Sequence, residues 1–117
     1  MDKKINADDA KKFLEDQEIA RKEKEEINRK AMLELVIESL RQLFEKKSVE
    51  IYLVGSVIKP YMFRPDSDID VVLKGFKGDR FEIWTQLEAM IKRNVEIILF
   101  EYCPFQDHVL NSGYKVM

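Results

Sequence analysis

The spacing of apolar residues changes about 30 residues into the chain. Residues 7–47 contain no glycine or proline and are rich in Ala, Leu, Glu, Lys and Arg, which predicts a helix. Before residue 30 the apolar positions are sparse. From there on they follow helical spacing and predict one buried stripe, made of Met32, Leu35, Val36, Leu40, Leu43 and Phe44. We therefore expect a charged helical extension over residues 1–30 and a globular domain over residues 31–117.

The extension supports two interpretations. Opposite charges stand four residues apart at three places and predict surface ion pairs, namely Glu18 with Lys22, Glu25 with Arg29, and Glu26 with Lys30. This pattern favours a solvated helix. Phe13, Ala20 and Ile27 recur at heptad spacing, which favours a docking arm for a partner helix instead. Gln17 and Lys24 interrupt the second apolar column of that heptad, and both interpretations stay open.

The rest of the chain alternates between strand and helix patterns. Apolar or β-branched runs predict strands at residues 49–54, 69–73 and 95–100. A helix is expected from Asp79, with Phe81 and Trp84 in the core. A short helix at 105–110 and an extended end at 114–117 follow. This order predicts an α/β fold, a small mixed sheet with helices packed on one face.

Composition narrows the class of protein. The 117 residues suffice for one domain, and a hydrophobic content of 45% predicts a packed core. The net charge of −2 argues against a protein that binds extended nucleic acid, because such domains carry a basic excess. Cys103 is the single cysteine, so we expect a reducing compartment. The first residues lack a secretory pattern, and no apolar run reaches the roughly 20 residues that span a bilayer. These features predict a cytoplasmic protein that does not enter membranes.

Two aspartates carry the first chemical signal. Asp68 and Asp70 stand two positions apart at a predicted strand, so their side chains project from the same face. Two neighbouring carboxylates are costly unless a cation compensates them. Mg²⁺ favours one or two carboxylates together with phosphate oxygens. The pair therefore predicts a metal site.

A glycine–serine pair ends the preceding predicted strand. Gly55 lets a backbone approach a phosphate closely, and N–H groups at a helix start attract anions. The hydroxyl of Ser56 adds a phosphate ligand. A phosphate cradle beside a carboxylate metal site is the equipment for nucleotidyl transfer.

A third acid stands inside the last predicted strand. Glu96 is flanked by Val95 and Ile97, where an acid is unusual in a purely structural strand. One interpretation makes it the third carboxylate of the cluster, near the nucleophile and able to accept its proton. The alternative is an exposed glutamate on an edge strand.

Together these motifs resemble the polymerase-beta-like nucleotidyltransferase superfamily, and in particular its minimal members. The resemblance covers about residues 32–117 and implies that Gly55 and Ser56 bind the triphosphate of ATP. It also implies that two Mg²⁺ ions are held by Asp68, Asp70 and Glu96. Lys59 stands where many members have an arginine, so it is either a phosphate contact or an ordinary surface cation.

The chain departs from the family pattern at three points. Pro60 stands where glycine is frequent, eleven residues separate Ser56 from Asp68, and Glu96 replaces a more usual aspartate. The longer side chain of Glu96 is expected to move the metal or to lower the activity.

The resemblance also implies a reaction and a partner. The expected reaction is in-line attack of an acceptor hydroxyl on the α-phosphorus of ATP, releasing pyrophosphate. Minimal members are commonly paired with an all-helical HEPN toxin, which predicts an antitoxin that adenylylates its partner. The chain has no room for a substrate domain, so acceptor selection is expected from the partner or from self-assembly into a homo-oligomer. Two alternatives remain, a non-catalytic binding antitoxin and a small-molecule nucleotidyltransferase of the antibiotic-modifying type.

Overall fold

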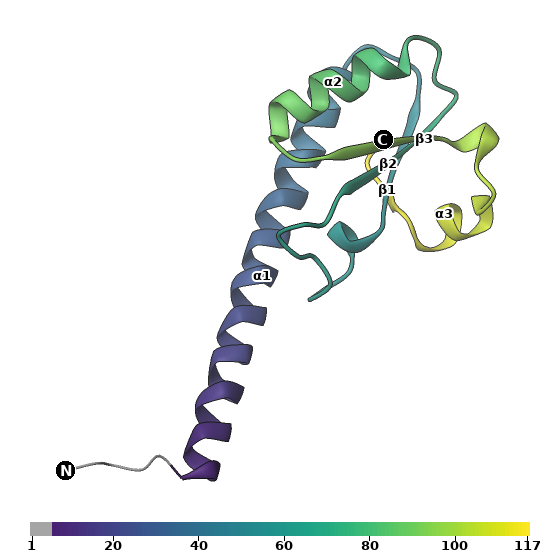
Figure 1. The fold of residues 1–117 in the computed structure, drawn as a ribbon. Helices are drawn as coiled ribbons and strands as arrows, with labels where there is room; N and C mark the ends of the chain where they lie inside the picture. The colour runs from purple at the N-terminus through teal and green to yellow at the C-terminus, as the bar shows by residue number, and fades with distance from the viewer. Residues whose placement is uncertain (1–5) are drawn as a thin grey trace.

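A computed structural model describes residues 6–117 and shows an elongated molecule of 71 × 29 × 18 Å. One helix, α1 (Ala7–Leu43), has 37 residues and is about 55 Å long at 1.5 Å per residue. Figure 1 shows its first half projecting beyond the rest of the chain. Asn6 caps the helix, because its side-chain oxygen accepts a hydrogen bond from the amide of Asp9 at 2.8 Å.

The projecting part of α1 is solvated. Every side chain from Lys11 to Lys24 is exposed, and the first buried side chain is Glu26. Ion pairs line this surface, although most differ from the expected ones. Lys22 does approach Glu18 at 4.0 Å, but Arg21 pairs with both Glu18 and Glu25.

The other two expected pairs are wrong. Arg29 does not pair with Glu25, and Glu26 does not pair with Lys30; instead Arg29 and Glu26 pair with each other. Residues three apart are neighbours on a helix as much as residues four apart, and here the three-residue pairs form. The predicted boundary at residue 30 falls inside α1, which continues across it without interruption.

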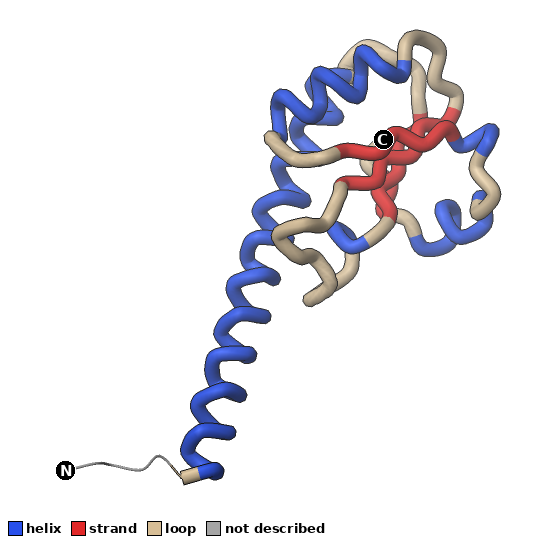
Figure 2. Tube along the Cα trace, viewed as in Figure 1, coloured by secondary structure: helices blue, strands red, loops and turns tan. Residues whose placement is uncertain are grey.

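The sheet has four strands in the order β3-β2-β1-β4. β1 (Glu50–Val54) is antiparallel to β2 (Ile69–Lys74), and β2 is parallel to β3 (Val95–Leu99). The short β4 (Tyr114–Lys115) pairs with β1. The parallel pair is connected through helix α2 (Arg80–Ile91), which starts at the capping residue Asp79. Figure 2 shows the strands crossing one another below α2 and beside the upper part of α1.

The main core lies between one face of the sheet and helices α1 and α2. Ile51, Leu53, Ile69, Val71 and Leu73 from the strands pack there with apolar residues of both helices, among them Val36, Leu40, Phe44, Ile83 and Leu87. Two expected core residues are misplaced. Leu35 remains 39% exposed and Phe81 remains 64% exposed, because each lies on the flank of its helix and not on the side that contacts the sheet.

The opposite face of the sheet is partly covered. After β3 the chain forms the 3₁₀ turn η2 (Phe100–Tyr102) and the helix α3 (Gln106–Ser112). Val109 of α3 is fully buried in a second cluster with Tyr52, Val54 and Phe100. Helices therefore lie against both faces of the sheet. Helices α1 and α2 cover the main-core face, and the shorter α3 covers part of the other, where no helix was expected. Among residues 6–117, no helix combines the length and the apolar composition needed to cross a membrane.

Candidate active site

Gly55 and Asp70 meet where β1 ends. Val54, the last residue of β1, is the register partner of Asp70 in β2, so Gly55 follows directly beside the carboxylate. Gly55 has φ +82°, and a Cβ atom built on it would lie 2.5 Å from Oδ2 of Asp70. Both observations require glycine at this position. The turn thus brings its backbone against the first site carboxylate.

Asp70 and Glu96 lie side by side on neighbouring parallel strands. They are register partners, each the second residue of its strand. The residues that flank them, Ile69 and Val71 as well as Val95 and Ile97, belong to the main core, so the two acids project from the opposite face. Glu96 is exposed on an edge strand, as the alternative interpretation had it, and is nevertheless brought to Asp70 by the register.

The corner formed by Gly55, Asp70 and Glu96 carries crowded negative charge. Burial, the neighbouring charge of Glu96 and the charge of Asp68 together raise the pKa of Asp70 to about 6. A hydrogen bond with Glu96 also favours the protonated carboxyl. A corner in which one carboxylate resists ionisation beside two others has the electrostatic character of a cation site.

Asp68 lies on an exposed loop just before β2. That loop is held in shape by Arg93, whose Nε donates a hydrogen bond to the carbonyl of Ser67 at 2.8 Å. The Arg93 guanidinium also donates to the carbonyl of Arg64 and lies 4.3 Å from the ring centroid of Phe63. The hydroxyl of Ser67 accepts a hydrogen bond from the amide of Arg64. Ser67 is thus a turn-forming residue, and Arg93 is a support that the sequence did not reveal.

The glycine–serine pair opens a single 3₁₀ turn, η1 (Ser56–Ile58). Ser56 is partly buried, and its carbonyl accepts a hydrogen bond from the amide of Lys59 at 3.1 Å. The side chain of Lys59 is exposed. The structure therefore places Ser56 and Lys59 on the loop beside Asp70, and phosphate binding by either stays a prediction.

The donor set of the corner suits a hard cation. Within residues 6–117, no group of three or more His, Cys, Asp or Glu side chains is arranged so that it could hold a metal ion. The assignment of Asp68, Asp70 and Glu96 as three metal ligands therefore stays a prediction. Mg²⁺ does not need a complete protein cage, since it retains waters and takes phosphate oxygens. Adjacent Asp70 and Glu96, with Asp68 at electrostatic range, fit that chemistry.

A buried ion pair in α1 reaches the same loop. Glu26 and Arg29 are 7% and 6% exposed; Arg29 contacts Val57 within η1, and Glu26 contacts Tyr61 just after it. Both residues were expected in surface ion pairs, because charged side chains are usually solvated. The available signal was helical phase, since Arg29 lies seven residues, about two turns, before the buried Val36.

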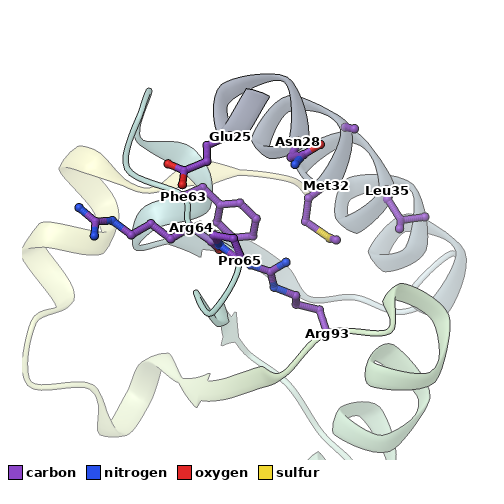
Figure 3. Close-up of a pocket in the computed structure, with 9 residues that line it drawn as sticks. Glu25, Asn28, Met32, Leu35, Phe63, Arg64, Pro65 and Arg93 are labelled. Carbon is purple, nitrogen blue, oxygen red and sulfur yellow. The ribbon is translucent and has the colours of Figure 1, made fainter. Parts of the chain in front are cut away.

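A groove of about 370 Å³ separates α1 from the loop that leads to Asp68. Figure 3 shows Met32 and Leu35 on the helix side, with Phe63 and Arg64 across from them and Arg93 below. Arg93 lines this groove, but none of the predicted site residues does.

Comparison with known proteins gives a likeness of fold. The sequence matches no known family and no curated protein. The structure is similar to a chain in the crystal structure of the toxin–antitoxin MntA–HepT, with a TM-score of 0.53 and 18% identity. The likeness covers 72% of this chain and 71% of that one. At this identity the likeness shows the fold alone, and it confirms the expected mixed α/β architecture.

Proposed function

We propose that this chain is a Mg²⁺-dependent nucleotidyltransferase that serves as the antitoxin of a toxin–antitoxin pair. The observation that carries the proposal is the corner formed by Gly55, Asp70 and Glu96, in which a glycine turn, two register-paired acids and a raised pKa coincide. The fold likeness to a chain of a toxin–antitoxin complex supports the biological setting.

Each residue of the corner has a role in this proposal. Gly55 keeps the turn free of a side chain, so the backbone and Ser56 can face the triphosphate. Asp68 and Asp70 would hold the metal, with Glu96 beside them where it can accept the proton of the attacking hydroxyl. Bound Mg²⁺ would supply charge neutralisation of the phosphates and polarisation of the attacking oxygen. Lys59, exposed on the same loop, would contact a phosphate.

The proposed donor is ATP and the proposed acceptor is a hydroxyl of an all-helical HEPN-type partner. The family resemblance implies both, and the absence of a substrate domain within residues 6–117 is consistent with an acceptor supplied by another protein. The acceptor must reach an open corner, and Asp68 and Glu96 are both exposed there.

A nucleotide-binding measurement tests the proposal directly. Calorimetry with Mg²⁺ and a non-hydrolysable ATP analogue should show saturable binding by the wild type and loss of Mg²⁺-dependent binding in Asp70→Asn. Asp16→Asn, which removes an exposed aspartate from the projecting part of α1, is the matched control and should bind normally. Undiminished binding by Asp70→Asn would remove the metal assignment.

A second function, neutralisation of a partner by contact alone, is favoured by a different observation. The projecting part of α1 exposes Phe13 and Leu14 to 61% and 63%, which gives a partner an apolar surface remote from the acids. The two functions differ in whether the acids are needed for neutralisation.

A further inference from the structure

The point where α1 reaches the domain is marked by a buried ion pair. Arg29 donates hydrogen bonds from Nε and Nη2 to the two carboxylate oxygens of Glu26, the second at 3.0 Å. Both side chains are among the few buried charged groups within residues 6–117. A buried ion pair adds little net stability, because desolvation offsets the attraction between the charges. The pair therefore invites an explanation other than stability.

The remaining hydrogen-bonding capacity of the pair is directed at one loop. Arg29 donates from Nη1 to the carbonyl of Val57 at 3.1 Å. Oε1 of Glu26 accepts from the amide of Tyr61, also at 3.1 Å. The pair thus holds the segment 57–61 near both ends. Lys59 lies in its middle, and Ser56 immediately precedes it.

The held segment has a conformation that its own sequence does not favour. Tyr61 has φ +63°, in the left-handed region that residues with a Cβ atom rarely adopt. Such a conformation persists when surrounding contacts impose it. The bond from the Tyr61 amide to Glu26 is such a contact, so α1 dictates how the loop leaves η1.

We infer that Glu26 and Arg29 are positioning residues, which fix the backbone of residues 57–61 and so set the affinity of the Gly55–Ser56 turn for a nucleoside triphosphate. The inference rests on the proposed function for its ligand. Neither residue touches the nucleotide; they act through the peptide groups of Val57 and Tyr61. Loss of the pair frees the loop, and binding must then order it at the cost of affinity.

The test replaces the ion pair with apolar residues of similar size. Glu26→Leu/Arg29→Met keeps the volume, and such exchanges are commonly neutral or stabilising, so the variant is expected to fold. The matched control is Glu18→Leu/Arg21→Met, which removes an ion pair with the same three-residue spacing from the solvated part of α1. Neither Glu18 nor Arg21 hydrogen-bonds the loop.

Three measurements are needed: nucleotide affinity, amide hydrogen exchange and thermal unfolding. Calorimetry with Mg²⁺ and a non-hydrolysable ATP analogue should show a Kd about tenfold higher for Glu26→Leu/Arg29→Met, the loss expected for one charge-assisted hydrogen bond. Hydrogen exchange followed by NMR should show faster exchange of the Tyr61 amide. Thermal unfolding should stay at or above that of the wild type, and the control variant should match the wild type in both Kd and exchange.

The outcomes separate this inference from the proposed function. An unchanged Kd in a folded Glu26→Leu/Arg29→Met variant overturns the positioning role. If the wild type itself binds no nucleotide, the proposed function fails. Hydrogen exchange then decides on the loop alone, and an equally protected Tyr61 amide in the variant overturns the inference.

Discussion

Gly55 lies so close to Asp70 that a methyl group on its Cα would stand 2.5 Å from Oδ2 of the carboxylate. The turn and the acid therefore form one unit, in which the backbone of one residue sets the position of the other's side chain. Their contact is produced by strand pairing, since Val54 and Asp70 are register partners.

The first prediction concerns Gly55→Ala. The new methyl group must displace the Asp70 side chain, and the residue must also adopt φ +82°. We expect a loss of about 1–2 kcal/mol in the free energy of unfolding and a loss of Mg²⁺-dependent nucleotide binding. Denaturant unfolding and calorimetry measure the two effects.

Gly75→Ala provides the control for Gly55→Ala. Gly75 has a similar φ of +75°, but a Cβ atom there would meet nothing within 4 Å. It should lose less stability than Gly55→Ala, because only the backbone conformation is strained, and it should retain nucleotide binding. Equal nucleotide affinity of the two variants would mean that the close approach of Gly55 to Asp70 is not needed for nucleotide binding.

The second prediction concerns the pH dependence of Asp70. Its pKa of about 6 lies above the ordinary 3.8, so ionisation of this carboxyl costs stability. The cost is absent below pH 3.8, grows as the pH rises, and is complete above about pH 6. Without added metal, Asp70→Asn should therefore be more stable than the wild type at pH 8 by about 1 kcal/mol, a figure reduced for partial exposure.

Denaturant unfolding of Asp70→Asn at pH 8 and at pH 3.5 checks the sign. The stability difference should disappear at the lower pH. The exposed Asp16→Asn should show no comparable gain at pH 8. An Asp70→Asn variant that is less stable than the wild type at pH 8 would contradict the assignment of crowded negative charge.

The third prediction concerns Glu26, whose titration has the opposite sign. The hydrogen bond from Arg29, followed by that from the Tyr61 amide, lowers the pKa of Glu26 to about 2. A lowered pKa stabilises the fold above the ordinary 4.5, and this contribution is lost as the pH falls from about 4.5 to about 2. Unfolding of Glu26→Gln and wild type should differ most near pH 6 and converge near pH 2. A constant difference across that range would show that Glu26 acts through shape and not through charge.

The fourth prediction separates enzymatic from contact neutralisation. With a toxic helical partner in the same cell, Asp68→Asn/Asp70→Asn should fail to restore growth if nucleotidyl transfer is the function. Glu96→Gln should transfer label from α-labelled ATP much more slowly while still co-purifying with the partner, because Glu96 lies at the corner with Asp70 and not on α1. Full neutralisation by the double variant would remove the enzymatic account.

Local patterns in the sequence predicted the elements well. The helical spacing from Met32 to Phe44 and the runs that became β1, β2 and β3 depend on near neighbours, so one sequence suffices to read them. The spacing of Asp68 and Asp70 predicted that both side chains project from one strand face; Asp68 instead precedes β2 on a loop, and its place in the site stays a prediction.

The features that the sequence could not show depend on contacts between residues far apart in the chain. The register that sets Glu96 beside Asp70 joins two strands separated by a helix. The burial of Glu26 and Arg29 was hidden because charged residues are treated as solvated by any composition rule. The predicted burial of Phe81 was wrong for a related reason, because helical spacing shows which face of a helix is apolar but not how wide the buried part of that face is.

Helix α1 fixes the distance between its N-terminal end and the domain. It runs from Ala7 to Leu43 without a glycine or proline, and so without a hinge, and one face of its last turns packs into the core. The direction of its free end is therefore tied to the direction in which Asp70 and Glu96 face. A protein that gripped the helix near Phe13 would have its distance and angle to the acidic corner set in advance, so the reach of the site would be determined by rigid geometry and not by a tether.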